Sequence, residues 1–259
     1  MLSQDNAKEL SRRLNIDLFT VCREYLQLLF LKYFYAQKET DRVFFKGGTA
    51  LRFLYESFRF SEDLDFTSLI SGDELTRLVE RALKNLGREL ENVRFRREGT
   101  HPQSFGGRLL QDLPMFKSPL TVKLDFSLRE KPVRTDVSLI ETQFPLSPYP
   151  RVSHLTVDEM MAETIRAIAT RVRGRDVFDL WFLLSKKVRI DWEIVERKME
   201  IYRETVDAGK LIGLIEQMPP EEIRNDLTRF LPLSHRTMVN DLRDSTLKKL
   251  REKGVTPNE

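Results

Sequence analysis

The chain has 259 residues, of which 41% are hydrophobic and 32% charged, so it can bury a core and wholesale disorder is excluded. Its 43 basic and 40 acidic residues leave a net charge of +3, which neither requires nor excludes a polyanionic partner. One cysteine excludes an internal disulfide and, with so few histidines, a Cys/His zinc cluster. The N-terminus lacks a signal-peptide pattern, and no stretch reaches the roughly 18 apolar residues of a membrane span. We therefore expect a soluble cytoplasmic protein with no membrane partner.

The first 150 residues predict helices followed by alternating strands and helices. Residues 8–37 contain neither proline nor glycine and carry leucines at helical spacing, which predicts a long helix, broken near Asn15. A second helix is expected from Thr49 to about Phe58. Ser71 and Glu74 form a capping-box pattern that predicts a third helix, to about Leu90. Short apolar or alternating runs predict strands at 41–45, 63–69, 92–98, 107–113, 121–128 and 136–144.

Residues 145–150, "PLSPYP", contain three prolines in six positions and are the best candidate for a domain boundary. Only helical patterns follow. Thr156 and Glu159 repeat the capping-box spacing, and that helix is expected to end at Gly174, with the next beginning at Arg175 or Asp176. We therefore predict an α+β protein with a strand-rich lobe over 1–150 and a helical lobe over 151–259.

Two aspartates lie two positions apart in the predicted strand at 63–69. Because side chains alternate along a strand, Asp63 and Asp65 share one face. They repel each other there, and a divalent cation would relieve the repulsion. Alternation in 121–128 places Asp125 on a polar face, so it joins the pair if the strands are neighbours. Three such carboxylates suit magnesium with a nucleoside triphosphate (NTP); the alternative is that they line a solvated sheet face.

Gly47-Gly48 connects a predicted strand to a predicted helix. In that geometry backbone N–H groups and the helix N-terminus can bind a phosphate. Thr49 offers a hydroxyl in the first turn, and Arg52 follows on the same helix face. The Walker pattern G-x-x-x-x-G-K-[ST] is absent. A tight turn with Arg52 on a solvated face is the alternative, but the aspartate pair close by in the sequence favours a phosphate site beside a metal site.

These segments resemble a known family. "KGGTALR" at 46–52 and "RFSEDLDF" at 59–66 are similar to the AbiEii-type nucleotidyltransferase toxins of the DNA polymerase β-like superfamily, and "RGRDVFDLWFLL" at 173–184 resembles that family's fourth motif. The resemblance covers about residues 44–184. It implies a polymerase β-like nucleotidyltransferase lobe with a mixed sheet, and a helical lobe that completes the cleft.

Carried over to this sequence, the resemblance implies an NTP substrate, Mg²⁺ (with Mn²⁺ as the alternative), an RNA acceptor such as a tRNA 3′ end, and a cognate antitoxin. The catalytic and metal-binding aspartates it implies are Asp63 and Asp65, to which strand alternation adds Asp125. The fourth motif adds Asp179 as a catalytic residue. The nucleotide-binding residues it implies are Lys46, Gly47, Gly48, Thr49, Arg52 and Asp176.

The sequence departs from the family at one position. The family usually carries a lysine in the helix before the fourth motif, and "MAETIRAIATR" at 161–171 places Thr164 there. Lys123, Arg166 or Arg171 could supply the missing charge. The departure keeps open a catalytically impaired module that binds nucleotide or RNA.

Arginines are concentrated in two stretches. Arg166, Arg171 and Arg175 fall close together with Arg173, and residues 81–97 carry a second basic run. Arginine forks suit phosphate, so the two stretches together are candidates for gripping an RNA backbone, with Arg166, Arg171 and Arg175 as the candidate contacts. The alternative is a solvated helix C-terminus, where cations are favoured.

The leading hypothesis is therefore a metal-dependent nucleotidyltransferase that moves a nucleoside monophosphate (NMP) to RNA, as the toxin of a toxin–antitoxin pair. Transfer to a protein hydroxyl uses the same chemistry and is an alternative, as are the impaired binding module and a plain interaction protein.

Overall fold

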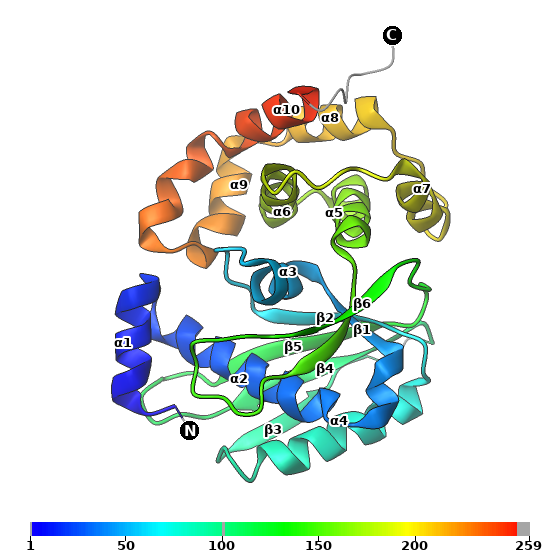
Figure 1. The fold of residues 1–259 in the computed structure, drawn as a ribbon. Helices are drawn as coiled ribbons and strands as arrows, with labels where there is room; N and C mark the ends of the chain where they lie inside the picture. The colour runs from blue at the N-terminus through cyan, green and yellow to red at the C-terminus, as the bar shows by residue number, and fades with distance from the viewer. Residues whose placement is uncertain (1, 100–101, 253–259) are drawn as a thin grey trace. The chain divides into compact units, whose positions relative to one another are not determined.

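The computed structural model describes residues 2–99 and 102–252 and divides into two compact units, Met1–Leu155 and Thr156–Glu259. Figure 1 labels the helices and strands of both. Within the described residues, none of the helices combines the length and apolarity that a membrane crossing requires.

The first unit begins with two helices, α1 (Gln4–Leu14) and α2 (Leu18–Tyr35). The expected break near Asn15 is confirmed, because Asn15 adopts a left-handed conformation with φ 53° and ends α1. Asp17 then caps α2 by accepting a hydrogen bond from the Thr20 backbone N–H. Most of α2 is buried, and Phe30 and Phe34 are fully enclosed. A 3-10 turn at Lys38–Arg42 leads into the sheet.

The sheet has seven strands in the order β3-β4-β5-β2-β1-β7-β6. β2 pairs with β5 and β1 with β7 in parallel, whereas the other neighbours are antiparallel, so the mixed sheet is as expected. Helix α3 (Gly47–Tyr55) connects β1 to β2, and α4 (Gly72–Leu86) connects β2 to β3. The strands are β1 Val43–Lys46, β2 Asp63–Ser68, β3 Val93–Arg97, β4 Ser104–Gln111, β5 Leu120–Ser127, β6 Thr135–Leu139 and β7 Arg151–Leu155.

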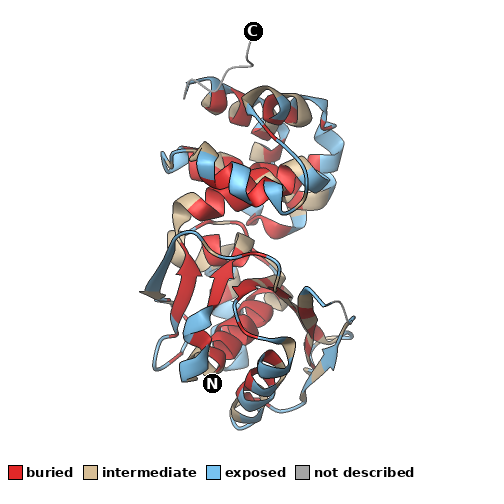
Figure 2. Ribbon diagram, turned by 90° about the vertical axis from the view of Figure 1, so that its right-hand side faces the viewer, coloured by how far each residue is buried: buried red, intermediate tan, exposed pale blue. Residues whose placement is uncertain are grey.

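Strand alternation gives the sheet one apolar and one polar face. Leu64, Phe66, Leu124 and Phe126 are fully buried, and the rings of Phe66 and Phe126 stack with centroids 4.4 Å apart. Helices α2 and α4 pack on this apolar face, and Figure 2 shows the resulting continuous buried layer. The residues between these positions, including the three aspartates, are consequently left on the polar face.

The second unit is helical. Helix α6 packs against α5, α9 and α10, and Val177, Phe178 and Leu180 are fully buried in its core. The helices are α5 Val157–Arg171, α6 Gly174–Ser185, α7 Trp192–Glu200, α8 Ala208–Gln217, α9 Pro220–Leu227 and α10 Leu242–Glu252, with 3-10 turns at Thr228–Phe230 and Leu233–Asn240.

Three local expectations are wrong around the junction. The chain after the prolines is not helical at once, because β7 first adds a strand beside β1. Thr156 gives α5 no side-chain cap, and the Glu159 carboxylate is paired with Lys198. Gly174 begins α6 rather than ending α5. A Cβ at Gly174 would lie 2.7 Å from the Ile223 Cα, so helix packing requires glycine there.

Candidate active site

The two glycines that begin α3, directly after β1, make room for two charged side chains. Gly47 has φ +79°, and a Cβ there would lie 2.5 Å from Asp65 Oδ2. A Cβ at Gly48 would lie 1.8 Å from an Arg59 guanidinium nitrogen. The backbone conformation favours glycine at position 47, whereas a side chain at position 48 would require the Arg59 guanidinium to move. The turn therefore holds the Asp65 carboxylate and the Arg59 guanidinium against the first turn of α3.

Thr49 anchors this helix to the neighbouring strand. Its side chain is buried, and its hydroxyl donates a hydrogen bond to the Asp63 carbonyl oxygen. The bond fixes the start of α3 beside β2, so the predicted phosphate-binding turn and the predicted metal ligands are brought together in one place. Lys46, at the N-cap, supplies no side-chain cap.

The strand register places the sequence-predicted side chains in rows across the polar face. Lys46 on β1 lies opposite Asp65 on β2, which lies opposite Asp125 on β5. Asp63 lies opposite Lys123 in the next row. The condition set by the sequence, that Asp125 must lie on a neighbouring strand, is therefore met. We call Asp63, Asp65 and Asp125 the carboxylate group.

Charge repulsion is strong within the carboxylate group. Burial, followed by the charges of Asp63 and Asp125, raises the pKa of Asp65 from 3.8 to about 7, although Lys46 and Lys123 oppose the shift. Lys123 Nζ lies 2.6 Å from Asp125 Oδ2. Burial lowers the Lys123 pKa, but this bond and the nearby carboxylates outweigh it and raise the pKa above its ordinary value. Negative charge is thus concentrated where an added cation would be stabilised.

The carboxylate group fits a divalent cation in donor chemistry, because hard oxygens suit Mg²⁺ and the repulsion around Asp65 is what a cation relieves. Within the described residues, no three His, Cys, Asp or Glu side chains are already gathered as a metal ligand set. Asp125 is engaged by Lys123 instead. The metal assignment consequently stays a prediction.

Arg52, predicted from the sequence to contact phosphate, is engaged within the protein. It forms a two-point ion pair with Glu24 on α2, donates to the Ser57 carbonyl, and lies 3.5 Å from the Phe60 ring centroid. Its side chain is only 12% exposed. The arginine at the glycine turn itself is Arg59, which the sequence analysis did not single out.

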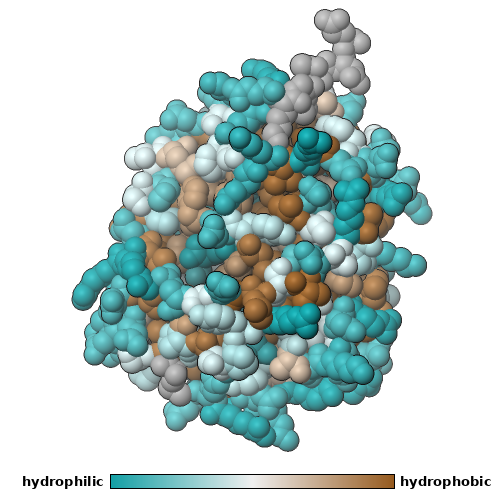
Figure 3. All heavy atoms as spheres, in the orientation of Figure 1, coloured by the Kyte–Doolittle hydropathy of each residue, from teal (hydrophilic) through white to brown (hydrophobic). Residues whose placement is uncertain are grey.

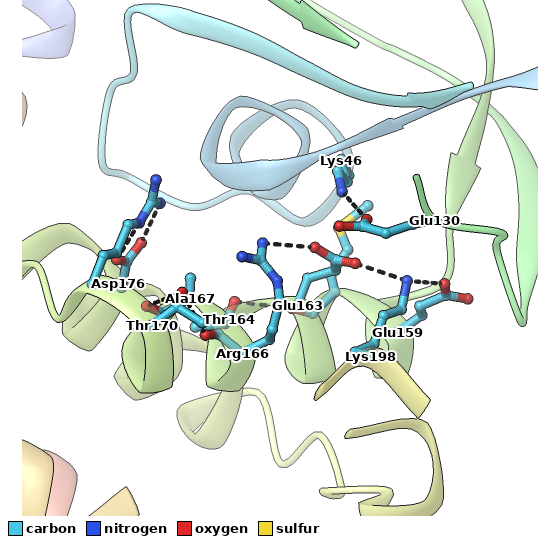
Figure 4. A network of polar contacts seen from close by, with 12 residues as sticks. Lys46, Glu130, Glu159, Glu163, Thr164, Arg166, Ala167, Thr170, Asp176 and Lys198 are labelled. Atoms are coloured by element: carbon cyan, nitrogen blue, oxygen red, sulfur yellow. Dashed lines mark hydrogen bonds and ion pairs between the residues drawn. The ribbon is translucent and has the colours of Figure 1, made fainter. Parts of the chain in front are cut away.

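Glu130 is the second residue that the sequence analysis missed. Its carboxylate is fully buried and lies 2.6 Å from Lys46 Nζ, as Figure 4 shows. Burial of one partner of an ion pair requires the other, so Glu130 fixes the ammonium group beside Asp65. Glu130 lies in an irregular segment after β5, where no periodic pattern could have identified it.

The predicted residues of the fourth motif lie in the helical unit. Asp176 and Asp179 are both buried in α6. Asp176 does not cap the helix, because Arg173 occupies that position. It accepts two hydrogen bonds from Arg171, at 3.0 and 3.1 Å. The other two predicted RNA contacts are also paired: Arg175 with Asp226 and Arg166 with Glu163.

The position of the missing family lysine is buried. Thr164 donates its hydroxyl to the Met160 carbonyl. On the same helix, Glu159 and Glu163 both contact Lys198 Nζ from α7, at 2.6 and 2.7 Å, as Figure 4 shows. The helical unit therefore has a buried lysine against α5, and α7 supplies it.

Comparison with solved structures identifies the fold. Over 99% of this chain and 94% of the other, it is similar to MenT4, a nucleotidyltransferase toxin from Mycobacterium tuberculosis H37Rv, with a TM-score of 0.58 and 18% identity. It is also similar to JHP933 from Helicobacter pylori, with a TM-score of 0.57 and 19% identity over 92% of this chain and 96% of the other. No curated protein sequence matches the chain significantly. The fold is that of nucleotidyltransferase toxins.

The protein family is identified by a match between the amino-acid sequence and a family model. The model described as "Nucleotidyl transferase AbiEii toxin, Type IV TA system" matches residues 29–247, and the chain belongs to this family. It is therefore a nucleotidyltransferase of a type IV toxin–antitoxin system, with an NTP as substrate and a cognate antitoxin. The match extends beyond the segment in which the sequence motifs were found.

Proposed function

We propose that this protein transfers an NMP from an NTP to an RNA 3′ end, with tRNA as the acceptor class, in a reaction that requires Mg²⁺ or Mn²⁺. The observation that carries the proposal is the position of Asp65 between Asp125 and Lys46, against the glycine turn that opens α3. A divalent cation held by the carboxylate group would neutralise charge on the reacting triphosphate.

Other residues of the first unit bind the triphosphate and assist the transfer. The N–H groups of Gly47, Gly48 and Thr49 at the start of α3 hold the β- and γ-phosphates. Lys46, kept in place by Glu130, adds a positive charge beside them. Arg52 acts there only when its guanidinium leaves Glu24. Asp125, now bonded to Lys123, would be a ligand of the cation when one is bound, or would accept the proton of the attacking hydroxyl.

The helical unit contributes the family's fourth motif. In this proposal Asp179 is catalytic and Asp176 binds nucleotide, while Arg166, Arg171 and Arg175 contact RNA phosphate by exchanging their present carboxylate partners. Lys198 supplies a positive charge near the position of the family lysine, since its ammonium lies 2.7 Å from the carboxylate of Glu163, the residue before Thr164.

The test is incubation of purified protein with total tRNA, Mg²⁺ and each α-³²P-labelled NTP in turn. Asp65→Ala is the inactive variant, and Asp136→Ala, which removes an exposed acid on β6, is the matched control. The proposal predicts label on RNA with one preferred NTP, in wild type and Asp136→Ala only. Label on protein would show that the acceptor is a protein and not RNA. Nucleotide-dependent stabilisation without any label would favour the impaired binding module instead.

A further inference from the structure

A second row of side chains crosses the polar face of the sheet next to Asp65. Arg96 on β3 lies opposite Arg108 on β4, Arg108 lies opposite Lys123 on β5, and Lys123 lies opposite Asp63 on β2. We call Arg96, Arg108 and Lys123 the basic row. At about 4.8 Å between neighbouring strands, the basic row and Asp63 span roughly 14 Å. It runs from the open edge strand β3 to the carboxylate group.

The side chains of the basic row are exposed, and their mutual repulsion destabilises the folded protein. The side chains of Arg96, Arg108 and Lys123 are 66, 41 and 42% exposed. Like charges directly opposite each other on neighbouring strands are destabilising, and here this happens twice in succession. Glu98 relieves part of the cost by pairing with Arg96 at 3.1 Å and Arg108 at 2.7 Å, and Asp125 pairs with Lys123. The two arginines therefore share one carboxylate, and Lys123 has its partner within the carboxylate group.

In the neighbouring row, which contains Asp125, the position on β4 has no side chain. Gly106 on β4 lies opposite Asp125, so no side chain stands between Asp125 and the edge strand in that row. Among the described residues, the one heavy atom within 4 Å of a Cβ placed at Gly106 is the Leu124 carbonyl oxygen, its chain neighbours aside. A strand of nucleic acid lying along the basic row can consequently bring its end to Asp125 past Gly106, which adds no side chain there.

We propose that the basic row binds the phosphate backbone of the acceptor RNA and directs its 3′ end to the carboxylate group. This proposal rests on the proposed function, because the basic row would bind the RNA acceptor of that reaction. The contacts are to phosphate, so the basic row carries affinity and little sequence preference. The triphosphate of the NTP is held separately, at the glycine turn of α3.

The experiment measures binding of a fluorescent single-stranded RNA by anisotropy in EDTA, without NTP, at several salt concentrations. The test variant is Arg96→Gln/Arg108→Gln. The matched control is Arg81→Gln/Arg97→Gln, because Arg97 is the next residue on β3 and points to the other face, while Arg81 lies on α4 and pairs with Glu39. Both double variants remove two arginines, so net charge is equal.

The proposal predicts that the test variant binds RNA about tenfold more weakly at 0.15 M salt, with the slope of log affinity against log salt smaller by about 1.4. The control keeps the wild-type slope, and the KM for NTP is unchanged in both. Glu98→Gln should bind RNA about threefold more tightly, a gain that misfolding cannot imitate.

Equal losses in the test and control variants would overturn the basic row as the RNA path. If wild type labels RNA and the test variant binds it normally, the path is wrong and the proposed function stands. If wild type neither binds nor labels RNA, the RNA acceptor fails with it.

Discussion

The carboxylate of Asp65 occupies the space that a side chain at position 47 would need, since a Cβ on Gly47 would lie 2.5 Å from its Oδ2 atom. The turn and the acid are thus one structural unit: the backbone conformation of Gly47 allows Asp65 to lie against the start of α3. A change at either residue is expected to affect the other.

Gly47→Ala should disable the enzyme and destabilise it. The left-handed conformation costs a residue with Cβ about 1–2 kcal/mol, and the clash displaces Asp65 in addition. Thermal unfolding and label transfer check both effects. Gly72→Ala is the control, because a Cβ at Gly72 meets nothing within 4 Å among the described residues. Equal behaviour of the two variants would contradict the coupling.

Asp65→Asn should stabilise the metal-free protein at alkaline pH. The pKa of Asp65 is raised from 3.8 to about 7, so the folded protein holds a proton that the unfolded chain has released between these pH values. The free energy of unfolding therefore falls as pH rises from about 4 to 7, and the penalty is complete above 7. The variant lacks it and should gain about 2–4 kcal/mol at pH 8.

Urea unfolding in EDTA at pH 8 and pH 4 measures this difference, which should vanish at the lower pH. Mg²⁺ should raise the unfolding temperature of wild type and leave that of Asp65→Asn nearly unchanged, because a ligand stabilises only the state that binds it. If Asp65→Asn were less stable than wild type at pH 8 without metal, the ionised Asp65 carboxylate would not destabilise the folded protein, contrary to this prediction.

Lys46 and Glu130 should show strong coupling. Removing either partner of this buried pair leaves the other charged and buried, which costs about 3–5 kcal/mol. Lys46→Met and Glu130→Gln should each be markedly destabilised, and the double variant should be more stable than the two losses predict. Glu216→Gln, which breaks the exposed pair with Arg251, should cost no more than about 1 kcal/mol. Additive losses at 46 and 130 would refute the pairing.

Arg52 and Glu24 allow structure and catalysis to be separated. Both Arg52→Ala and Glu24→Ala break the ion pair and should be destabilised, Arg52→Ala more strongly because it also loses the contacts with the Ser57 carbonyl and the Phe60 ring. Contact of Arg52 with the triphosphate adds a several-fold higher KM for NTP in Arg52→Ala alone. Steady-state kinetics at a temperature where both variants are folded give the answer. The same KM in both would limit Arg52 to holding α3 against α2.

The sequence predicted the strands and helices that carry local periodicity, and with them the polar face of β2 and β5. The turn at Gly47-Gly48 was also identified, since glycines between a strand and a helix have few other uses. What it could not supply was strand order: the parallel pairing of β2 with β5 joins segments nearly sixty residues apart, and no pattern within either strand specifies its neighbour.

Contacts between long side chains could not be predicted from the sequence either. Lys46 was expected beside phosphate, but its partner Glu130 lies in an irregular segment, and only the fold brings them within 2.6 Å. The capping-box pattern at Thr156 failed: Thr156 makes no cap bond, and the Glu159 carboxylate pairs with Lys198 on α7, a contact that the local pattern cannot reveal. The surface view in Figure 3 is rich in hydrophilic side chains, so charge alone could not distinguish the basic row from the rest.

The most direct measurement compares α-³²P-labelled with γ-³²P-labelled NTP on tRNA, in wild type and Asp65→Ala. Nucleotidyl transfer keeps the α-phosphorus on the product and releases the γ-phosphorus with pyrophosphate. We predict that wild type labels the RNA 3′ end from the α position only, and that Asp65→Ala loses this label at least about a hundredfold. Label from the γ position, or an undiminished signal in Asp65→Ala, would contradict nucleotidyl transfer at the carboxylate group.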